Sequence, residues 1–342
     1  MKKIIIIGAG AMGSAFAVPC LENQNEVTLV GTHLEDELIK GIKSNKNFHP
    51  ALSIELPSKL RVEKFEKLSS ILESGVDIIV AGVSSIGIEW FVEKISQYYK
   101  KNLPIILLTK GLAIEENELM TLSDKIKKLL REKGHTEINV SAIKGPCLAA
   151  GLANKMRTGT VIANPDIKET ELLKKIISTD YYSTEISDDL TGVELAGAIK
   201  NIYSMLIGAS EGLSNSKASK EIQSKYYLNT SASLIHRSIS EMVEFVSYYG
   251  GKADTVYGLA GLGDLYVSAI GGRNSLMGKY LGEGYLYNEA KEKFMKNVTV
   301  EGAQLALEIG PKILQELNSK HFPLMFSMIK TICENKKLEI KW

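Results

Sequence analysis

The spacing of apolar positions divides the chain into two parts with different periodicities. Short apolar runs of strand length alternate with helix-spaced segments up to about residue 187, and helical spacing dominates afterwards. The predicted strands are 3–7, 27–30, 76–83, 104–109, 138–143 and 159–163. The predicted helices are 14–22, 86–99, 116–132, 189–212, 226–249, 256–270 and 301–318. We therefore predict an α/β domain with a doubly wound, mainly parallel sheet over 1–187, followed by an all-α domain over 188–342.

A glycine-rich turn follows the first predicted strand. Gly8, Gly10 and Gly13 fit the pattern G-x-G-x-x-G, and strand, turn, helix and second strand fill about thirty residues, as one βαβ unit requires. Such glycines permit the tight turn, the close approach of a pyrophosphate and the packing of the helix on the strand. The N-terminus of the following helix supplies N–H groups for phosphates, and Ala11 and Met12 within the turn are candidate cofactor contacts. The pattern predicts a Rossmann-type dinucleotide-binding domain; a turn that binds nothing is the alternative.

Composition narrows the class of protein. The net charge of +1 favours neither nucleic acid nor an anionic membrane as a partner. The cysteines Cys20, Cys147 and Cys333 form no metal-binding or disulfide pattern, which fits a reducing compartment. The sequence shows no signal peptide and no apolar run approaching the ~20 residues that span a bilayer. We expect a soluble, cytoplasmic protein without a metal site.

Polar residues follow two of the predicted strands. Ser84 comes after the strand 76–83, and Lys110 comes after five apolar residues and a threonine. Ligands of open α/β sheets bind beyond the carboxyl ends of the strands, so both residues are candidates for contact with a cofactor or substrate. The alternative for Lys110 is a solvated lysine that opens a loop.

The predicted helix near 191–212 carries a second lysine. Lys200, Asn201 and Ser204 share one face with Gly197 and Gly208, and the other faces are apolar, which is typical of a buried central helix. Burial lowers the pKa of a lysine and makes it a competent general base. The alternative is a lysine whose stem crosses the interior while its ammonium reaches water.

A third group of candidates lies in glycine-rich segments. Asp264 follows the run from Gly258 to Gly263 and is either a helix N-cap or a partner for Lys200 or a substrate hydroxyl. Arg273 and Asn274 follow two glycines and precede a helix predicted from Ser275 to Leu281. An arginine fork beside a helix N-terminus suits a phosphate or a carboxylate.

Together these motifs resemble the NAD(P)-dependent glycerol-3-phosphate dehydrogenases of bacteria and archaea. The resemblance runs nearly end to end and rests on motifs that recur in order. They are the glycine turn 8–13, 109–111, 145–146, 192–201, 258–264, 273–274 and 300–302. It implies interconversion of sn-glycerol 3-phosphate and dihydroxyacetone phosphate with NADP or NAD, which supplies glycerol phosphate for membrane lipids. It also suggests a homodimer.

The resemblance assigns residues one by one. Lys200 matches the proton acceptor, Asp264 and Asn201 match active-site polar residues, and Ser268 matches a nearby hydroxyl. Lys110 matches a lysine that contacts both cofactor and substrate. The remaining matches are Arg273 and Asn274 at the substrate phosphate, Arg273 and Glu301 at the cofactor, Gly145 and Cys147 in the substrate loop, and Ser84 and Ala149 at the cofactor.

The chain departs from the family pattern at several positions. Cys147 stands where a serine is usual, Gly151 where a glutamate is usual, and Gly272 where a serine is common. The second predicted strand ends before Thr32 and His33, without the acid of NAD enzymes or the arginine of many NADP-using relatives. Glu35 and Asp36 are close enough to repel a phosphate, whereas the family habit favours NADP, so we expect NADP or NAD with a slight preference for NADP.

Two other functions share parts of this pattern. A related two-domain dehydrogenase that acts on a hydroxy acid or sugar acid would place a carboxylate where we expect a phosphate. A sensor that binds NAD(P)H without turnover would keep the glycine turn and lose the base. The presence of Lys110, Lys200, Asp264 and Arg273 together favours an enzyme acting on a small phosphorylated substrate.

Overall fold

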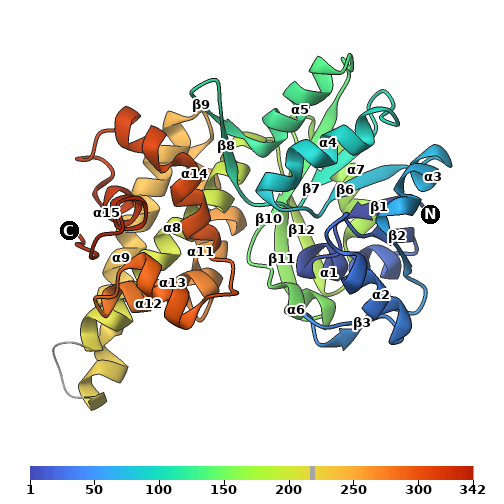
Figure 1. The fold of residues 1–342 in the computed structure, drawn as a ribbon. Coiled ribbons are helices and arrows are strands. Elements are labelled where there is room, and N and C mark those ends of the chain that lie inside the picture. The colour runs from blue at the N-terminus through green and yellow to red at the C-terminus, as the bar shows by residue number, and fades with distance from the viewer. Residues whose placement is uncertain (216–219, 342) are drawn as a thin grey trace. The chain divides into compact units, whose positions relative to one another are not determined.

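The chain folds into two compact units. The structure is a computed structural model that describes residues 1–215 and 220–341 (Figure 1). One unit comprises Met1–Lys110 and Leu122–Leu190, and the other comprises Gly111–Thr121 and Thr191–Trp342. A single break near residue 187, as the sequence suggests, misses the short excursion of 111–121 into the second unit.

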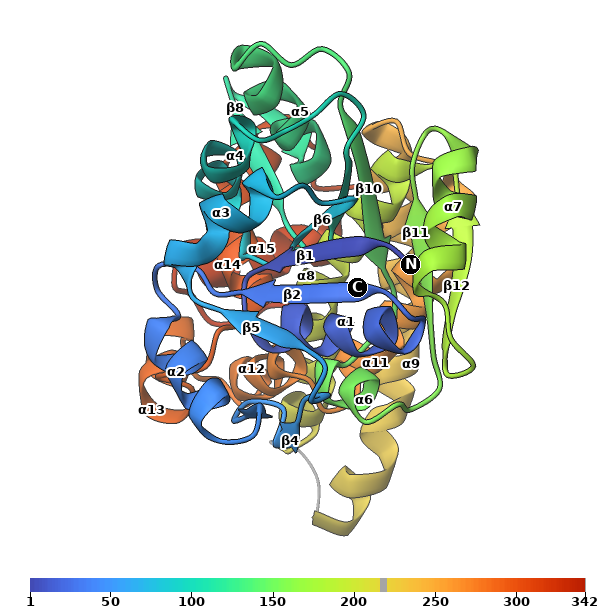
Figure 2. The same cartoon turned by 90° about the vertical axis from the view of Figure 1, so that its right-hand side faces the viewer.

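The first unit is built on a mainly parallel sheet of eight strands, which confirms the predicted fold class. The strand order is β12-β11-β10-β7-β6-β1-β2-β5, and only the β10–β11 pair is antiparallel. Figure 2 shows β6, β1, β2 and β5 next to one another in this order. The strands are β1 (Lys3–Ile7), β2 (Glu26–Val30), β5 (Arg61–Glu63), β6 (Ile78–Ala81), β7 (Pro104–Leu107), β10 (Asn139–Lys144), β11 (Thr158–Ala163) and β12 (Tyr182–Ser187). All six predicted strands are present, whereas β5 and β12 at the edges were not predicted.

Helices connect the strands and cover the sheet. Several of them carry an apolar stripe; the buried side of α5, for example, carries Leu122, Ile126 and Leu130. By contrast, α1 is buried on all sides from Gly13 to Cys20. The helices of this unit are α1 (Ala11–Glu22), α2 (Asp36–Ser44), α3 (Leu68–Glu73), α4 (Ile88–Ser96), α5 (Leu122–Glu132), α6 (Ala149–Ala153) and α7 (Ile167–Ile177). A small hairpin of β3 (Phe48–His49) and β4 (Ile54–Glu55) follows α2.

The predicted helix over 116–132 is wrong in its first part. A hairpin of β8 (Leu112–Glu115) and β9 (Glu118–Thr121) precedes α5, and Glu116 and Asn117 form its turn with φ of 52° and 65°. Two consecutive residues with positive φ favour a tight hairpin turn over a helix. The hairpin packs on α14 (Glu301–Glu316) in the second unit.

The rest of the second unit is helical, as predicted. Its described residues from 191 to 341 contain no strand. The remaining helices are α8 (Leu190–Asn215), α9 (Lys220–Tyr248), α10 (Ala253–Tyr257), a π-turn over Leu259–Gly263, α11 (Asp264–Ala269), α12 (Arg273–Gly282), α13 (Tyr287–Phe294) and α15 (Pro323–Cys333). The buried, nearly all-apolar α8 lies at the centre of their common core.

Glycines let two helices touch the backbone of α8 directly. A Cβ on Gly278 of α12 would lie 1.8 Å from the carbonyl oxygen of Met205, and one on Gly302 of α14 would lie 2.3 Å from that of Asn201. Both distances exclude any side chain. The N-terminus of α14 is thereby held against the turn of α8 that carries Lys200 and Asn201.

A buried carboxylate joins α9 to the start of α15. Glu241 accepts hydrogen bonds from the backbone N–H groups of Leu324 at 2.8 Å and Met325 at 2.9 Å. The Tyr203 hydroxyl donates to the same carboxylate at 3.1 Å. Burial outweighs these donors and raises the pKa of Glu241 to about 7.

The raised pKa of Glu241 predicts a pH-dependent stability. The folded protein keeps this proton up to about pH 7, whereas the unfolded carboxyl releases it near the ordinary value of 4.5. Because the folded state then binds more protons, its free energy of unfolding falls as pH rises through this window. Relative to Glu241→Gln, the wild type should lose about 1–3 kcal/mol between these pH values in urea denaturation. A difference that is constant with pH would contradict this assignment.

Candidate active site

In the glycine turn, Gly8 and Gly13 are tightly packed against neighbouring backbone, whereas Gly10 faces open space. Gly8 has φ of 111°, and a Cβ there would lie 2.6 Å from the carbonyl oxygen of Gly82. A Cβ on Gly13 would lie 2.2 Å from the Gly8 oxygen. At Gly10, by contrast, the nearest atom would be Glu35 Oε1 at 4.0 Å. This open side, next to Ala11 and Met12 at the start of α1, fits the pyrophosphate of a dinucleotide.

The segment after β2 is organised by a residue that the sequence did not single out as a ligand. Glu35 Oε2 accepts hydrogen bonds from the backbone N–H groups of Thr32 at 2.7 Å and Ala9 at 3.0 Å. The exposed ring of His33 packs against Trp90, with centroids 5.1 Å apart. The sequence predicts Glu35 only as a nearby negative charge, because it lies five positions beyond Val30, the last residue of β2.

At the ends of β6 and β7, the candidates Ser84 and Lys110 lie in the first unit, exposed and half-buried respectively. The Thr109 hydroxyl donates to the carbonyl oxygen of Val83 at 2.6 Å and so ties the two strand ends together. Lys144, only 2% exposed, donates from Nζ to the Thr109 carbonyl at 2.7 Å. The backbone leading into Lys110 is therefore fixed from two sides.

The predicted substrate loop begins at the end of β10. Gly145 has φ of 139°, and a Cβ there would lie 3.0 Å from Thr160 Cα on β11. Cys147 donates its backbone N–H to the Gly145 oxygen at 2.8 Å, and its side chain, like that of Ala149, packs against the edge of the core. A Cβ on Gly151 would meet its nearest atom only at 3.9 Å. The missing glutamate at this position is therefore not a consequence of crowding.

In the second unit, α8 and α11 bring three candidates together. Lys200 is 3% exposed and donates from Nζ to Asp264 Oδ1 at 2.7 Å. The same ammonium donates to the Ser268 hydroxyl one turn further along α11. Asp264 begins α11 after the N-cap residue Gly263, so it serves as the partner of Lys200 and not as the cap. The alternative in which the ammonium reaches water is wrong.

A chain of amides joins α8, α12 and α14 next to this pair. Asn274 donates from Nδ2 to Asn201 Oδ1 at 2.9 Å, and its Oδ1 accepts the backbone N–H of Gly302 at 2.9 Å. Beside it, Arg273 forms an ion pair with Glu301 at 2.9 Å, and both side chains are about half exposed. Asn274 is thus held rigidly, whereas the arginine fork remains accessible to solvent.

The start of α12 differs from its prediction. The helix begins at Arg273, two residues earlier than expected, with Gly272 at the N-cap position. A Cβ on Gly272 would lie 2.7 Å from the carbonyl oxygen of Ser268, so the serine common in the family would require this turn to shift.

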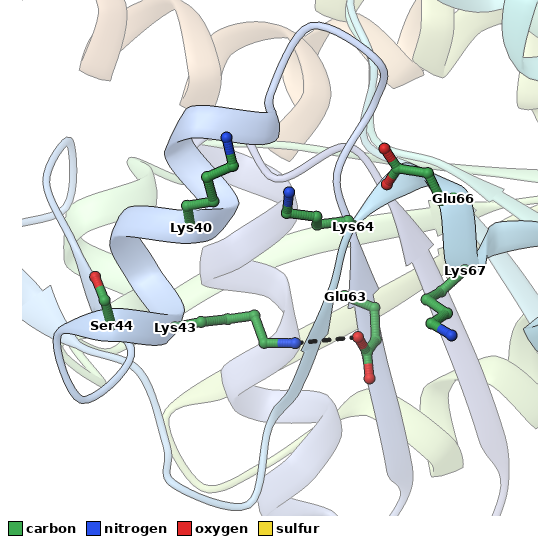
Figure 3. A pocket seen from close by; sticks show the side chains of 7 residues that line it. All are labelled: Lys40, Lys43, Ser44, Glu63, Lys64, Glu66 and Lys67. Carbon is green, nitrogen blue, oxygen red and sulfur yellow. Dashed lines mark hydrogen bonds and ion pairs between the residues drawn. The ribbon is translucent and has the colours of Figure 1, made fainter.

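A separate surface pocket of about 650 Å³ lies beside α2 in the first unit (Figure 3). Three of its four lysines are paired with carboxylates: Lys43 lies 3.2 Å from Glu63, Lys64 lies 3.5 Å from Asp36, and Lys40 is paired with Glu37. The lining residues are Lys40, Lys43, Ser44, Glu63, Lys64, Glu66 and Lys67. None of them is among the predicted site residues.

The described part of the chain holds neither a metal-binding cluster nor a membrane-spanning helix. No group of three or more histidine, cysteine, aspartate or glutamate side chains there could hold a metal ion. No described helix combines the length and apolar character that crossing a membrane requires.

Two protein families match the chain, one over its N-terminal part and one over its C-terminal part. The C-terminal family described as "NAD-dependent glycerol-3-phosphate dehydrogenase C-terminus" matches residues 189–341, and the corresponding N-terminal family matches residues 3–170. The chain belongs to the NAD-dependent glycerol-3-phosphate dehydrogenase family. The resemblance stated from the motifs is thus confirmed.

Individual members of the family support the same conclusion over nearly the whole chain. The NADP(+)-dependent glycerol-3-phosphate dehydrogenase of Archaeoglobus fulgidus is 32% identical, covering 98% of this chain and 96% of its own. The glycerol-3-phosphate dehydrogenase [NAD(P)+] of Shouchella clausii is 31% identical, covering 92% and 88%. The crystal structure of glycerol-3-phosphate dehydrogenase from Coxiella burnetii is 26% identical, with a TM-score of 0.80 and coverage of 98% and 96%.

Proposed function

We propose that this protein interconverts sn-glycerol 3-phosphate and dihydroxyacetone phosphate with a nicotinamide cofactor. The observation that carries the proposal is the buried Lys200–Asp264 pair with its Ser268 neighbour, in a chain of the glycerol-3-phosphate dehydrogenase family. Burying a lysine and a carboxylate costs desolvation free energy that their mutual attraction often does not recover, so a buried pair is weak evidence for a purely stabilising role. Proton transfer to or from a substrate oxygen gives the pair a chemical role instead.

Lys200 is the proposed proton-transfer group. Its ammonium, held by Asp264, donates a proton to the C2 oxygen during reduction of the ketone, and the neutral amine takes the proton back during oxidation of the alcohol. When bound, the nicotinamide supplies the hydride donor or acceptor. Asp264 and Ser268 fix the direction of Nζ, which keeps the proton aligned with one oxygen atom.

Arg273 and Asn274 are the proposed groups for the substrate phosphate. The guanidinium of Arg273 lies at the N-terminus of α12, where the helix dipole also favours an anion. Its ion pair with Glu301 is half exposed and is therefore weak enough to be exchanged for a phosphate. Asn201 and Gly302 hold the amide of Asn274 in place.

We propose the remaining domain and residue roles on the basis of the family resemblance. We propose the first unit as the dinucleotide-binding domain and the second as the substrate-binding and catalytic domain. The proposed cofactor contacts are Gly8, Gly10, Ala11, Met12, Gly13, Thr32, His33, Ser84, Ala149, Arg273 and Glu301, with Lys110 contacting both cofactor and substrate and Gly145 and Cys147 the substrate. A role in membrane lipid synthesis and a homodimeric, cytoplasmic enzyme are parts of the same proposal.

Initial rates of NADH and NADPH oxidation test the proposal most directly. We expect rapid turnover with dihydroxyacetone phosphate and little with dihydroxyacetone, because binding energy from the phosphate orients the reacting carbon. The absence of turnover with either cofactor, in a protein that binds one of them, would overturn the substrate assignment. A panel of 2-oxo acids would then test the alternative dehydrogenase.

A further inference from the structure

Glu35 is placed to select the cofactor at the end of the second strand. Its Oε2 is fixed by the backbone N–H groups of Ala9, inside the glycine turn, and of Thr32, just after β2. His49, which is 1% exposed, also contacts this turn, with its Nε2 atom 3.0 Å from the carbonyl oxygen of Ala9. The carboxylate is therefore part of the glycine turn in space, although it lies 25 residues beyond Gly10 in the sequence.

The second oxygen of this carboxylate faces the open part of the turn. Oε1 is the atom nearest to the empty Cβ position of Gly10, at 4.0 Å, and it makes no hydrogen bond within the described residues. An acidic group at this place in a Rossmann-type domain accepts hydrogen bonds from ribose hydroxyls. A 2′-phosphate, which carries about −1.5 to −2 charges at neutral pH, would be repelled by it.

The lysines around the start of α2 do not offset the negative charge of Glu35, because they are paired with other carboxylates. Lys64 is paired with Asp36 at 3.5 Å, and Lys40 is paired with Glu37 (Figure 3 shows both lysines). Farther along α2, Lys43 is paired with Glu63 at 3.2 Å. Asp36 and Glu37 also occupy the first turn of α2, so that the positive end of its dipole is already matched by negative charge.

We infer that Glu35 is the cofactor-specificity residue of this protein, that it receives the ribose diol of NAD(H), and that it disfavours NADP(H). The inference rests on the proposed use of a nicotinamide cofactor but not on the proposed substrate. It reverses the slight preference for NADP expected from the sequence. It also sets this chain apart from its NADP(+)-dependent relative in Archaeoglobus fulgidus.

Binding titrations of NADH and NADPH with the full chain, without any substrate, test the inference. The wild type should bind NADH at least about tenfold more tightly than NADPH, equivalent to about 1.4 kcal/mol. Equal binding, or tighter binding of NADPH, would overturn it. Since the assay does not depend on turnover, a failure here is distinguishable from a wrong substrate.

Glu35→Gln separates charge from structure, because the amide oxygen still accepts from Ala9 and Thr32. We expect this variant to bind NADPH about fivefold to tenfold more tightly and NADH more weakly than the wild type. Glu66→Gln is the control, since it removes the same charge from the lining of the pocket beside α2 without breaking the Lys64–Asp36 or Lys40–Glu37 pairs, and it should change the NADH/NADPH ratio less than about twofold. An equal shift in both variants would assign the preference to the general field and overturn the role of Glu35.

Discussion

Replacing Lys200 with glutamine is expected to lower kcat by about 10²–10⁴-fold in both directions of the reaction. The amide cannot deliver or accept the proton at the C2 oxygen, although it still donates a hydrogen bond to Asp264. Cofactor binding should be unchanged, because the variant leaves the glycine turn and its surroundings intact. Steady-state rates and an NADH titration on the same preparation measure the two quantities separately.

Loss of folding must be separated from loss of chemistry in this experiment. Lys200→Ala removes the ammonium that pairs with the buried carboxylate of Asp264, which costs about 3–5 kcal/mol of unfolding free energy, so glutamine is the better choice. Lys279→Gln is a matched control, since Lys279 also forms an ion pair in the second unit, with Glu211 at 2.6 Å. It should keep wild-type kcat. Full turnover in Lys200→Gln would remove Lys200 from the mechanism.

Replacing Arg273 with alanine should raise KM for dihydroxyacetone phosphate by about 10–100-fold. Its ion pair with Glu301 is half exposed and contributes at most about 1 kcal/mol to stability, so the variant should fold normally. Arg273→Lys keeps the charge but loses the planar fork, so its KM should lie between those of the wild type and Arg273→Ala. Initial rates over a range of substrate concentrations give the values of KM.

The unphosphorylated ketone provides the internal control for Arg273. At saturating cofactor, the slow reduction of dihydroxyacetone should be the same in the wild type and in Arg273→Ala, because no phosphate is there to be bound. An equal loss of kcat/KM for both ketones under these conditions would show that Arg273 does not act on the substrate phosphate. An unchanged KM for dihydroxyacetone phosphate would place the phosphate elsewhere.

The sequence predicts those parts of the fold whose signals are local. The strand at Lys3–Ile7 and the helix around Lys200 are buried, and their uniform apolar character is visible in any short window. The edge strand β5 was missed because it has only three residues. The edge strand β12 was missed because polar residues interrupt it, which weakens the apolar pattern. The turn at Glu116 and Asn117 was missed because the surrounding residues fit a helical spacing equally well.

The candidate site shows the same division. Lys200 and Asp264 were recognised by type and by motif, but only the structure shows which alternative for Asp264 holds. Glu35 could not be found as a ligand by spacing, because its role depends on a side chain that reaches back to Ala9. Lys144 was missed for a related reason: its ammonium donates to the backbone carbonyls of Leu107 and Thr109, and such contacts leave no mark on the sequence.

The excursion of Gly111–Thr121 affects how the protein can be dissected genetically. A fragment cloned from Thr191 onward would lack the hairpin that packs on α14, including Leu112, which is 1% exposed in the helical core. The complementary fragment would keep that hairpin, but the apolar residues of the hairpin would be exposed to solvent. Fragment expression, two-hybrid baits and domain swaps between relatives should therefore carry residues 111–121 together with the C-terminal part, joined through a designed linker.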